Sequence, residues 1–136
     1  MNRTKARTEA FLLIFEKCFK SDEKLEEIKA DAAEARDFEE DEFIDRLSVG
    51  TISNLEKIDG IIEENLRGWK MNRISKVNLS ILRLAIYEML FEDDVPVSVS
   101  INEAVELAKK YSDEKDSSYV NGVLGTVSRK YCEDKK

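Results

Sequence analysis

The N-terminal segment gathers basic side chains that could bind an anionic ligand. Its first eight residues hold Arg3, Lys5 and Arg7 and no acidic residue. On a helix, Arg3 and Arg7 would lie on one face because they are four residues apart, whereas Lys5 would point elsewhere. Guanidinium groups in that arrangement can contact phosphates and stack on bases. Three basic residues are few for a nucleic-acid site, so composition alone favours a frayed, solvated terminus by about two to one.

A second candidate is the aromatic residue Tyr119, near the start of the last helix that the sequence predicts. An exposed ring at a helix start, beside free backbone N–H groups, can stack on a base next to a phosphate. A partly buried core ring is an equally good interpretation of Tyr119. Gly122 and Gly125 within this helix indicate a close approach to a neighbouring helix.

Residues for catalysis or metal binding are scarce. The chain has no histidine, which removes the usual general base near neutral pH and the commonest metal ligand. Cys18 and Cys132 form neither a disulfide framework nor a zinc motif. Cys18 falls in an apolar stripe, where an inert core thiol is favoured over a nucleophile by about ten to one. The sequence therefore predicts no enzyme, no cofactor and no metal site.

The net charge of −7 is unevenly distributed. Residues 21–45 contain twelve acidic and three basic side chains, and the remainder of the chain carries a net +2. A local basic face is therefore compatible with the acidic total. The longest apolar run, from Ala10 to Phe15, is too short for a membrane span or a secretory signal. These features predict a soluble cytoplasmic protein with no membrane segment.

The length and the apolar periodicity predict one all-α domain, residues 1–136, with six or seven helices. Five glycines and one proline are too few for a sandwich or a barrel. Helices are predicted over 3–20 and from Ser21 or Asp22 onward, followed by a connection over 36–41. An amphipathic stretch over 43–66 should bend or break near Gly50 or Gly60 and stop at Gly68.

The second half of the chain has a stronger apolar signal. Residues 74–91 are apolar on more than one face, which is typical of the central helix of a bundle. Residues 95–99 are expected to be an extended connection. Ser100 and Glu103 then match a capping box for a helix to about Tyr111. A polar break over 112–116 precedes the last helix.

Several segments resemble the NusB family of bacterial transcription antitermination factors. Ile101-Asn-Glu-Ala-Val-Glu-Leu-Ala-Lys109 and Tyr119-Val-Asn-Gly-Val-Leu124 are similar to its C-terminal signature. Ile81-Leu-Arg-Leu-Ala-Ile-Tyr-Glu88 followed by Asp94-Val-Pro96 resembles the preceding segment, and Lys5-Ala-Arg7 with Ala10 resembles the first helix. The resemblance covers nearly the whole chain except residues 21–41.

The resemblance implies two small helical subdomains that bind boxA-type single-stranded RNA together with NusE, a small-subunit ribosomal protein. In the RNA polymerase antitermination complex, this pair supports ribosomal RNA synthesis. Carried over by position, the RNA-binding residues are Arg3, Lys5, Arg7, Ser118 and Tyr119. Ser118 departs from the family, which has a basic residue there.

Candidate contacts for the protein partner are Phe15, Phe19 and Asn78. The spacing of the two phenylalanines alone slightly favours core positions for both rings. An alternative function is a homodimeric protein-interaction module that does not bind RNA directly. The related N-terminal domain of RNA cytosine methyltransferases is less favoured, because no methyltransferase domain follows the last predicted helix.

Overall fold

The chain folds into helices joined by turns. The computed structural model describes residues 2–36, 41–66 and 70–135, and in these ranges all regular secondary structure is helical. The elements are α1 (Arg3–Phe19), α2 (Leu25–Arg36), α3 (Glu42–Ser53), α4 (Leu55–Glu64), the 3-10 helix η1 (Met71–Arg73), α5 (Lys76–Phe91), α6 (Val97–Tyr111) and α7 (Glu114–Tyr131). The prediction of an all-α bundle of six or seven helices is confirmed.

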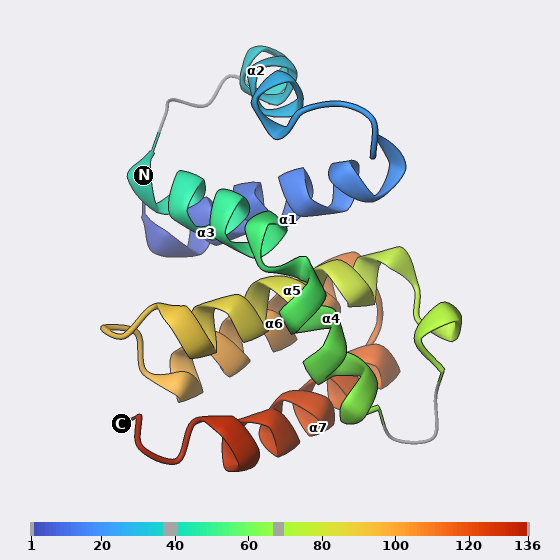
Figure 1. Ribbon diagram of the computed structural model, residues 1–136, viewed down its shortest axis with the longest axis vertical. Coiled ribbons are helices and arrows are strands. Elements are labelled where there is room, and N and C mark those ends of the chain that lie inside the picture. Colours follow the sequence, from blue (N-terminus) through green and yellow to red (C-terminus); the bar gives the residue numbers. More distant parts are fainter. Residues whose placement is uncertain (1, 37–40, 67–69, 136) are drawn as a thin grey trace.

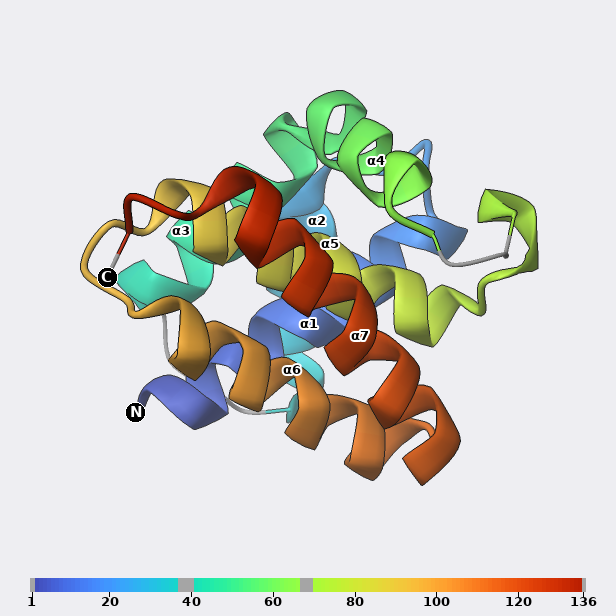
Figure 2. The same cartoon turned by 90° about the horizontal axis from the view of Figure 1, so that it is seen from below.

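Helix α5 is the centre of the bundle. It contacts α1 and α3 on one side and α4, α6 and α7 on the other. In Figure 1, α1, α2 and α3 form the upper group, and α4 to α7 form the lower group. Figure 2 shows α6 and α7 next to each other from below. One cluster of buried apolar side chains runs through both groups, and it includes the fully buried Ile81, Leu82 and Ile86 of α5. The apolar surface on several faces of residues 74–91 is thus explained by this central position.

Side-chain caps fix where four of the helices begin. Asn2, Asp41, Ser75 and Asp113 each accept a hydrogen bond from a backbone N–H in the first turn of α1, α3, α5 and α7, respectively. Each cap satisfies a donor that the helix leaves unpaired and contributes about 1 kcal/mol. The cap at Asp113 starts α7 inside the polar break that the sequence predicts.

The acidic helix begins later than its sequence suggests. The prediction that it opens at Ser21 or Asp22 is wrong, because α2 starts at Leu25. The ammonium group of Lys17, at the end of α1, donates hydrogen bonds to the carbonyl oxygens of Ser21 and Glu23, at 2.8 and 2.7 Å. These carbonyls bind the preceding helix and hold this segment as a turn.

The predicted break near a glycine falls at an asparagine instead. Helix α3 ends and α4 begins at Asn54, whose side-chain amide donates to the carbonyl of Gly50 at 2.7 Å. Its backbone N–H bonds to the carbonyl of Thr51, which tightens the last turn of α3. Gly60 lies inside α4. The predicted stop at Gly68 lies outside the described residues.

The predicted extended connection over 95–99 is also wrong in its second half. Helix α6 already begins at Val97, after Pro96 with φ of −59°. Proline has a φ suited to a helix start and lacks the N–H that would be unpaired there. Ser100 therefore lies inside the helix, where it is buried, and forms no capping box with Glu103.

Candidate nucleic-acid interface

Two ends of one helix pair hold the candidate RNA-binding residues. Helices α1 and α6 run in the same direction: Thr4 donates to Glu103 at 2.8 Å near their starts, and the rings of Phe11 and Tyr111 are 5.1 Å apart further along. In Figures 1 and 2, the start of α1 and the start of α7 lie on opposite sides of the molecule. We call these two regions the basic end, at the start of α1, and the aromatic end, at the start of α7 just past the last turn of α6. Together they bound the face formed by α1 and α6.

At the basic end, Arg3 and Lys5 are exposed. The guanidinium carbon of Arg3 lies 4.4 Å from the centre of the Phe43 ring, and one of its nitrogens is 3.5 Å from a carboxylate oxygen of Asp94. Its side chain is still 48% exposed. Both residues are therefore open to a phosphate in solvent.

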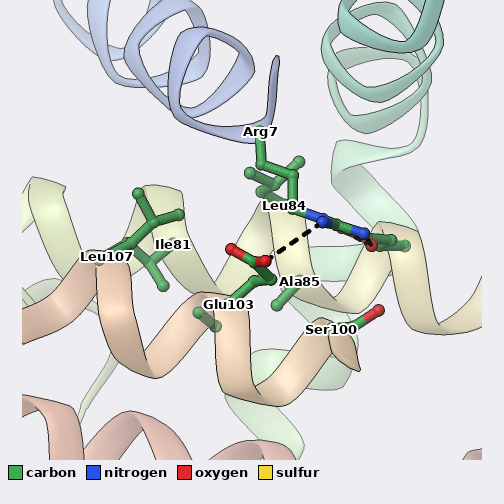
Figure 3. Close-up of a pocket in the computed structure, with 9 residues that line it drawn as sticks. Arg7, Ile81, Leu84, Ala85, Ser100, Glu103 and Leu107 are labelled. Atoms are coloured by element: carbon green, nitrogen blue, oxygen red, sulfur yellow. Dashed lines mark hydrogen bonds and ion pairs between the residues drawn. The ribbon is translucent and has the colours of Figure 1, made fainter. Parts of the chain in front are cut away.

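Arg7 has a different environment, although it is only one turn from Arg3. It is 3% exposed, and its Nε and Nη2 atoms donate to the carboxylate of Glu88 at 2.6 to 3.0 Å. Nη1 lies 3.5 Å from Glu103, and Figure 3 shows Arg7 pointing from α1 toward this residue on α6. The sequence predicts Arg7 on the same helix face as Arg3, with a guanidinium group free to contact phosphates. The structure corrects this, because Arg7 joins α1 to α5 and α6 and does not present its guanidinium to solvent.

The space beside this ion pair cannot hold a ligand. It measures about 10 Å³ and is lined by apolar side chains and by Ser100. Burial of an arginine and a glutamate is costly unless the pair is well bonded, and removal of one partner leaves a charge unpaired in the core. The pair thus joins the upper and lower groups of helices through a contact that is costly to break.

At the aromatic end, Ser118 is exposed and Tyr119 is half-buried, both in the first turns of α7. Tyr119 borders a hollow of about 270 Å³ between the starts of α5 and α7, and so does Asn78, which is 6% exposed. The remaining lining residues are Arg73, Ile74, Ser75, Lys115 and Asp116. The exposed residues Lys109 and Lys110 lie in the last turn of α6, just before α7. The sequence grouped Asn78 with the protein-partner residues, but the structure puts it next to Tyr119.

The two phenylalanines continue an aromatic row along α1. The ring of Phe15 lies 6.2 Å from that of Phe11 and 5.1 Å, edge to face, from that of Phe19. Phe15 is half-buried, whereas Phe19 is 63% exposed. The interpretation of both rings as core is therefore wrong for Phe19, which stands in solvent at the end of the helix.

The carboxylate partner of Arg7 is the residue that the sequence analysis missed. Glu88 is 1% exposed and belongs to the central helix. A signal for it exists in the sequence, because a glutamate inside a segment that is apolar nearly all round must be paired when it is buried. The identity of its partner, 81 residues away, has no comparable signal.

The two cysteines have different surroundings. Cys132 is 6% exposed, and burial raises the pKa of its thiol, so it is protonated and unreactive near neutral pH. Cys18 is half-buried between α1 and α5, and its sulfur lies 3.6 Å from the hydroxyl oxygen of Ser80 and 3.5 Å from a guanidinium nitrogen of Arg83. Within residues 2–36, 41–66 and 70–135, no three side chains of the types that ligate metals come together. None of the helices described is long and apolar enough to cross a membrane.

Comparison with known proteins assigns this arrangement to a family. The model of the NusB family matches residues 4–129. The chain belongs to the NusB family. It is 46% identical to the transcription antitermination protein NusB of Clostridium botulinum (strain Loch Maree / Type A3), an alignment that covers 93% of this chain and 99% of that protein. It is 43% identical to the NusB protein of Listeria monocytogenes serovar 1/2a, with 94% and 97% of the chains covered.

Solved structures of NusB proteins share the fold. T. maritima NusB is 34% identical, superposes with a TM-score of 0.88, and the match covers 98% of this chain and 95% of that one. In the crystal structure of the antitermination factors NusB and NusE in complex with double-stranded RNA, a matching chain is 29% identical. Its TM-score is 0.85, and the match covers 96% of this chain and all of that one. The resemblance in the sequence motifs is therefore confirmed over the whole fold.

Proposed function

We propose that this protein is a transcription antitermination factor that binds boxA-type single-stranded RNA together with NusE and supports ribosomal RNA transcription in the cytoplasm. The observation that carries the proposal is the likeness, over nearly all of the chain, to NusB proteins, one of which was solved with NusE and RNA. The continuous core supports the further proposal that residues 1–136 act as one domain. In this proposal the protein assists the polymerase as a binding factor and catalyses no reaction.

The RNA lies along α1 and α6 in this proposal. Arg3 and Lys5 contact phosphates at the basic end, since both side chains are exposed to solvent. At the aromatic end, the half-buried ring of Tyr119 stacks on a base, and the exposed hydroxyl of Ser118 bonds to the backbone. Arg7 takes no direct part in RNA binding; its ion pair with Glu88 holds α1 in the position from which Arg3 and Lys5 reach the RNA.

NusE binds a surface that includes Phe19 and the edge of Phe15. The support for this assignment is the 63% exposure of Phe19, an unusual position for a large aromatic side chain in a protein without a partner. NusE and RNA use different parts of the surface, so both can bind at once. From the likeness to NusB proteins we expect positive coupling, in which each ligand raises the affinity for the other by the same factor.

Titration of a fluorescent boxA-type RNA with the chain, with NusE and with both tests the proposal. We expect binding by the chain alone that tightens when NusE is added, and no comparable binding to an RNA of the same composition in scrambled order. Gel filtration of the same samples addresses the alternative function. A dimer that persists in the presence of RNA and carries none with it would favour the protein-interaction module.

A further inference from the structure

The hollow at the aromatic end has the features of a pocket for a single base. We propose that it receives one unstacked base of the bound RNA and that Asn78 reads the edge of this base. The preferred base has an exocyclic amino group, which adenine, cytosine and guanine carry and uracil lacks. This inference rests on the RNA binding proposed above and adds to it a residue that determines specificity.

The side chain of Asn78 is buried, and its amide oxygen has no hydrogen-bond donor in the part of the chain that the structure describes. The residue is 6% exposed, and its Oδ1 atom has no hydrogen-bond partner among the described residues. Buried polar atoms in native proteins are nearly always bonded, and an acceptor left without a donor costs about 1–3 kcal/mol. Since Asn78 lines the hollow, a ligand that brings an N–H group into this space would supply the missing donor.

The walls of the hollow suit a flat, aromatic ligand. Tyr119 of α7 contributes a ring, and Ile74, before the start of α5, contributes apolar surface. A base that leaves the RNA stack gains stacking on an aromatic side chain, which every base can use. The volume of about 270 Å³ lies below the usual range for drug-sized ligands, which favours one base over a longer segment.

The charged residues around the hollow can bind the other parts of a nucleotide: the cations can contact its phosphates, and the carboxylate can accept from an amino group of its base. Arg73 and Lys115 are exposed at its rim, where cations can contact the phosphates on either side of the base. The carboxylate of Asp116 is a second acceptor and also accepts a hydrogen bond from Ser112. Asparagine pairs with the amino group and ring nitrogen of adenine, and aspartate accepts from the amino group of cytosine. Uracil has a single N–H on its Watson–Crick edge, and the carbonyl oxygens on either side of it would face the second acceptor.

A scan with abasic RNA tests the assignment on the intact chain. In a set of boxA-type oligonucleotides, each position in turn loses its base, and the affinity of the wild type and of Asn78→Ala is measured by fluorescence anisotropy. At one position we expect the wild type to lose about tenfold in affinity. Asn78→Ala should bind the intact RNA about tenfold more weakly than the wild type and lose nothing further at that position. An abasic profile for Asn78→Ala identical to that of the wild type would overturn the inference.

A second panel places adenine, cytosine, guanine and uracil at the position found. The wild type should bind adenine, cytosine or guanine at least about fivefold more tightly than uracil, and Asn78→Ala should remove the difference. A preference of the wild type for uracil, or equal binding of all four bases, would overturn the assignment of the base. Asn72→Ala changes an exposed asparagine of the neighbouring η1 that does not line the hollow, and it should keep the wild-type profile.

Thermal melts separate a loss of RNA affinity from a loss of stability of the fold. Asn78→Ala removes an acceptor that has no partner, so its melting temperature should equal or exceed that of the wild type. Asn78→Ser, which shortens the side chain and keeps a polar group, is measured in parallel. It should lose the same RNA contact, and it replaces the alanine variant in the comparison if that variant melts at a lower temperature. A wild type that binds no boxA-type RNA at all would overturn the proposed function. A wild type that binds RNA independently of Asn78 would overturn this inference alone.

Discussion

The two ends of the α1 and α6 face use their polar groups differently. At the basic end, Arg7 is bonded to Glu88 inside the protein, and Arg3 lies over the ring of Phe43. At the aromatic end, the buried Asn78 has an acceptor without a donor and borders a hollow. The buried charges at one end are thus paired within the fold, whereas the buried amide oxygen at the other end has no donor among the residues described. A count of basic residues alone points to the basic end and gives no sign of this difference.

Within the basic end, Arg3 and Arg7 show that helical spacing fixes a direction without fixing burial. Both point to one side of α1, and both guanidinium groups lie near the ring of Phe43, at 4.4 and 5.3 Å. Arg7 is one turn further along the helix, where α5 and α6 cover this side, whereas Arg3 remains half-exposed. The same residue type therefore serves the fold at one position and remains open to a ligand at the other.

The largest expected effect is on stability, at the ion pair. Arg7→Ala leaves the carboxylate of Glu88 buried without its partner, and we expect a loss of about 3–5 kcal/mol in the free energy of unfolding. Urea denaturation of the variant and of the wild type measures the difference. Arg3→Ala is the matched control, and its half-exposed side chain should cost no more than about 1 kcal/mol.

The double variant Arg7→Met with Glu88→Leu refines this prediction. It replaces both charges with apolar groups of similar volume, so most of the lost stability should return. If Arg7→Ala unfolds at the same urea concentration as the wild type, the ion pair does not hold the helices together, and the contrast between the ends is wrong.

The next effect is on RNA affinity, at Tyr119. If its ring stacks on a base, Tyr119→Ala should weaken RNA binding by about 1–3 kcal/mol, and Tyr119→Phe should cost little because stacking uses the ring. A purely structural ring would instead lower stability by about 3–5 kcal/mol on truncation. A thermal melt and an RNA titration on both variants distinguish the two roles. An alanine variant with unchanged stability and unchanged RNA affinity removes Tyr119 from the interface.

A smaller effect is expected at Phe19, which belongs to the surface proposed for NusE. Because the ring is 63% exposed, Phe19→Ala should change stability by no more than about 0.5 kcal/mol. Its affinity for NusE should fall by at least about 1 kcal/mol, with RNA binding in the absence of NusE unchanged. Calorimetric titration measures the affinity for NusE, and fluorescence anisotropy measures RNA binding in the absence of NusE. A loss of NusE binding no larger than the loss of stability would mean that Phe19 lies outside the interface.

The smallest effect concerns individual phosphate contacts at the basic end. The logarithm of the RNA affinity should fall with the logarithm of salt concentration with a slope of roughly −2 to −4, at about 0.7 per contact on single strands. The double variant Arg3→Ala with Lys5→Ala should reduce the size of the slope by about 1.4. Arg7→Met with Glu88→Leu should leave the slope unchanged because Arg7 is buried. A flat salt response of the wild type would exclude the electrostatic contribution.

The helices could be predicted from the sequence because their apolar residues recur with helical spacing over long segments. The positions at which one helix ends and the next begins were harder to predict from the sequence. Gly50 and Gly60 looked like the weak points, but the side chain of Asn54 ends α3 by bonding back to a carbonyl. At Pro96, an alternating apolar run of five residues resembled an extended segment, although proline also begins helices. Short segments carry too few periods to separate the two alternatives.

The candidate site was predictable in its residue types and unpredictable in its partners. Motifs identified Arg7 and Tyr119 as important, but the contact between Arg7 and Glu88 spans 81 residues and depends on how the helices pack. Asn78 is a second example, because spacing along the chain gives no sign that it borders the same hollow as Tyr119. It is brought next to Tyr119 by the packing of α5 against α7.

The buried ion pair also has a consequence for the order in which the chain can fold during synthesis. Arg7 is made early, and its carboxylate partner follows 81 residues later. At about 5–20 residues per second, the ribosome needs roughly 4–16 s to add that stretch. Until then the guanidinium of Arg7 stays in water, and α1 has no central helix to pack against. Helix α1 is therefore translated well before the central helix and reaches its native surroundings only after α5 has been made.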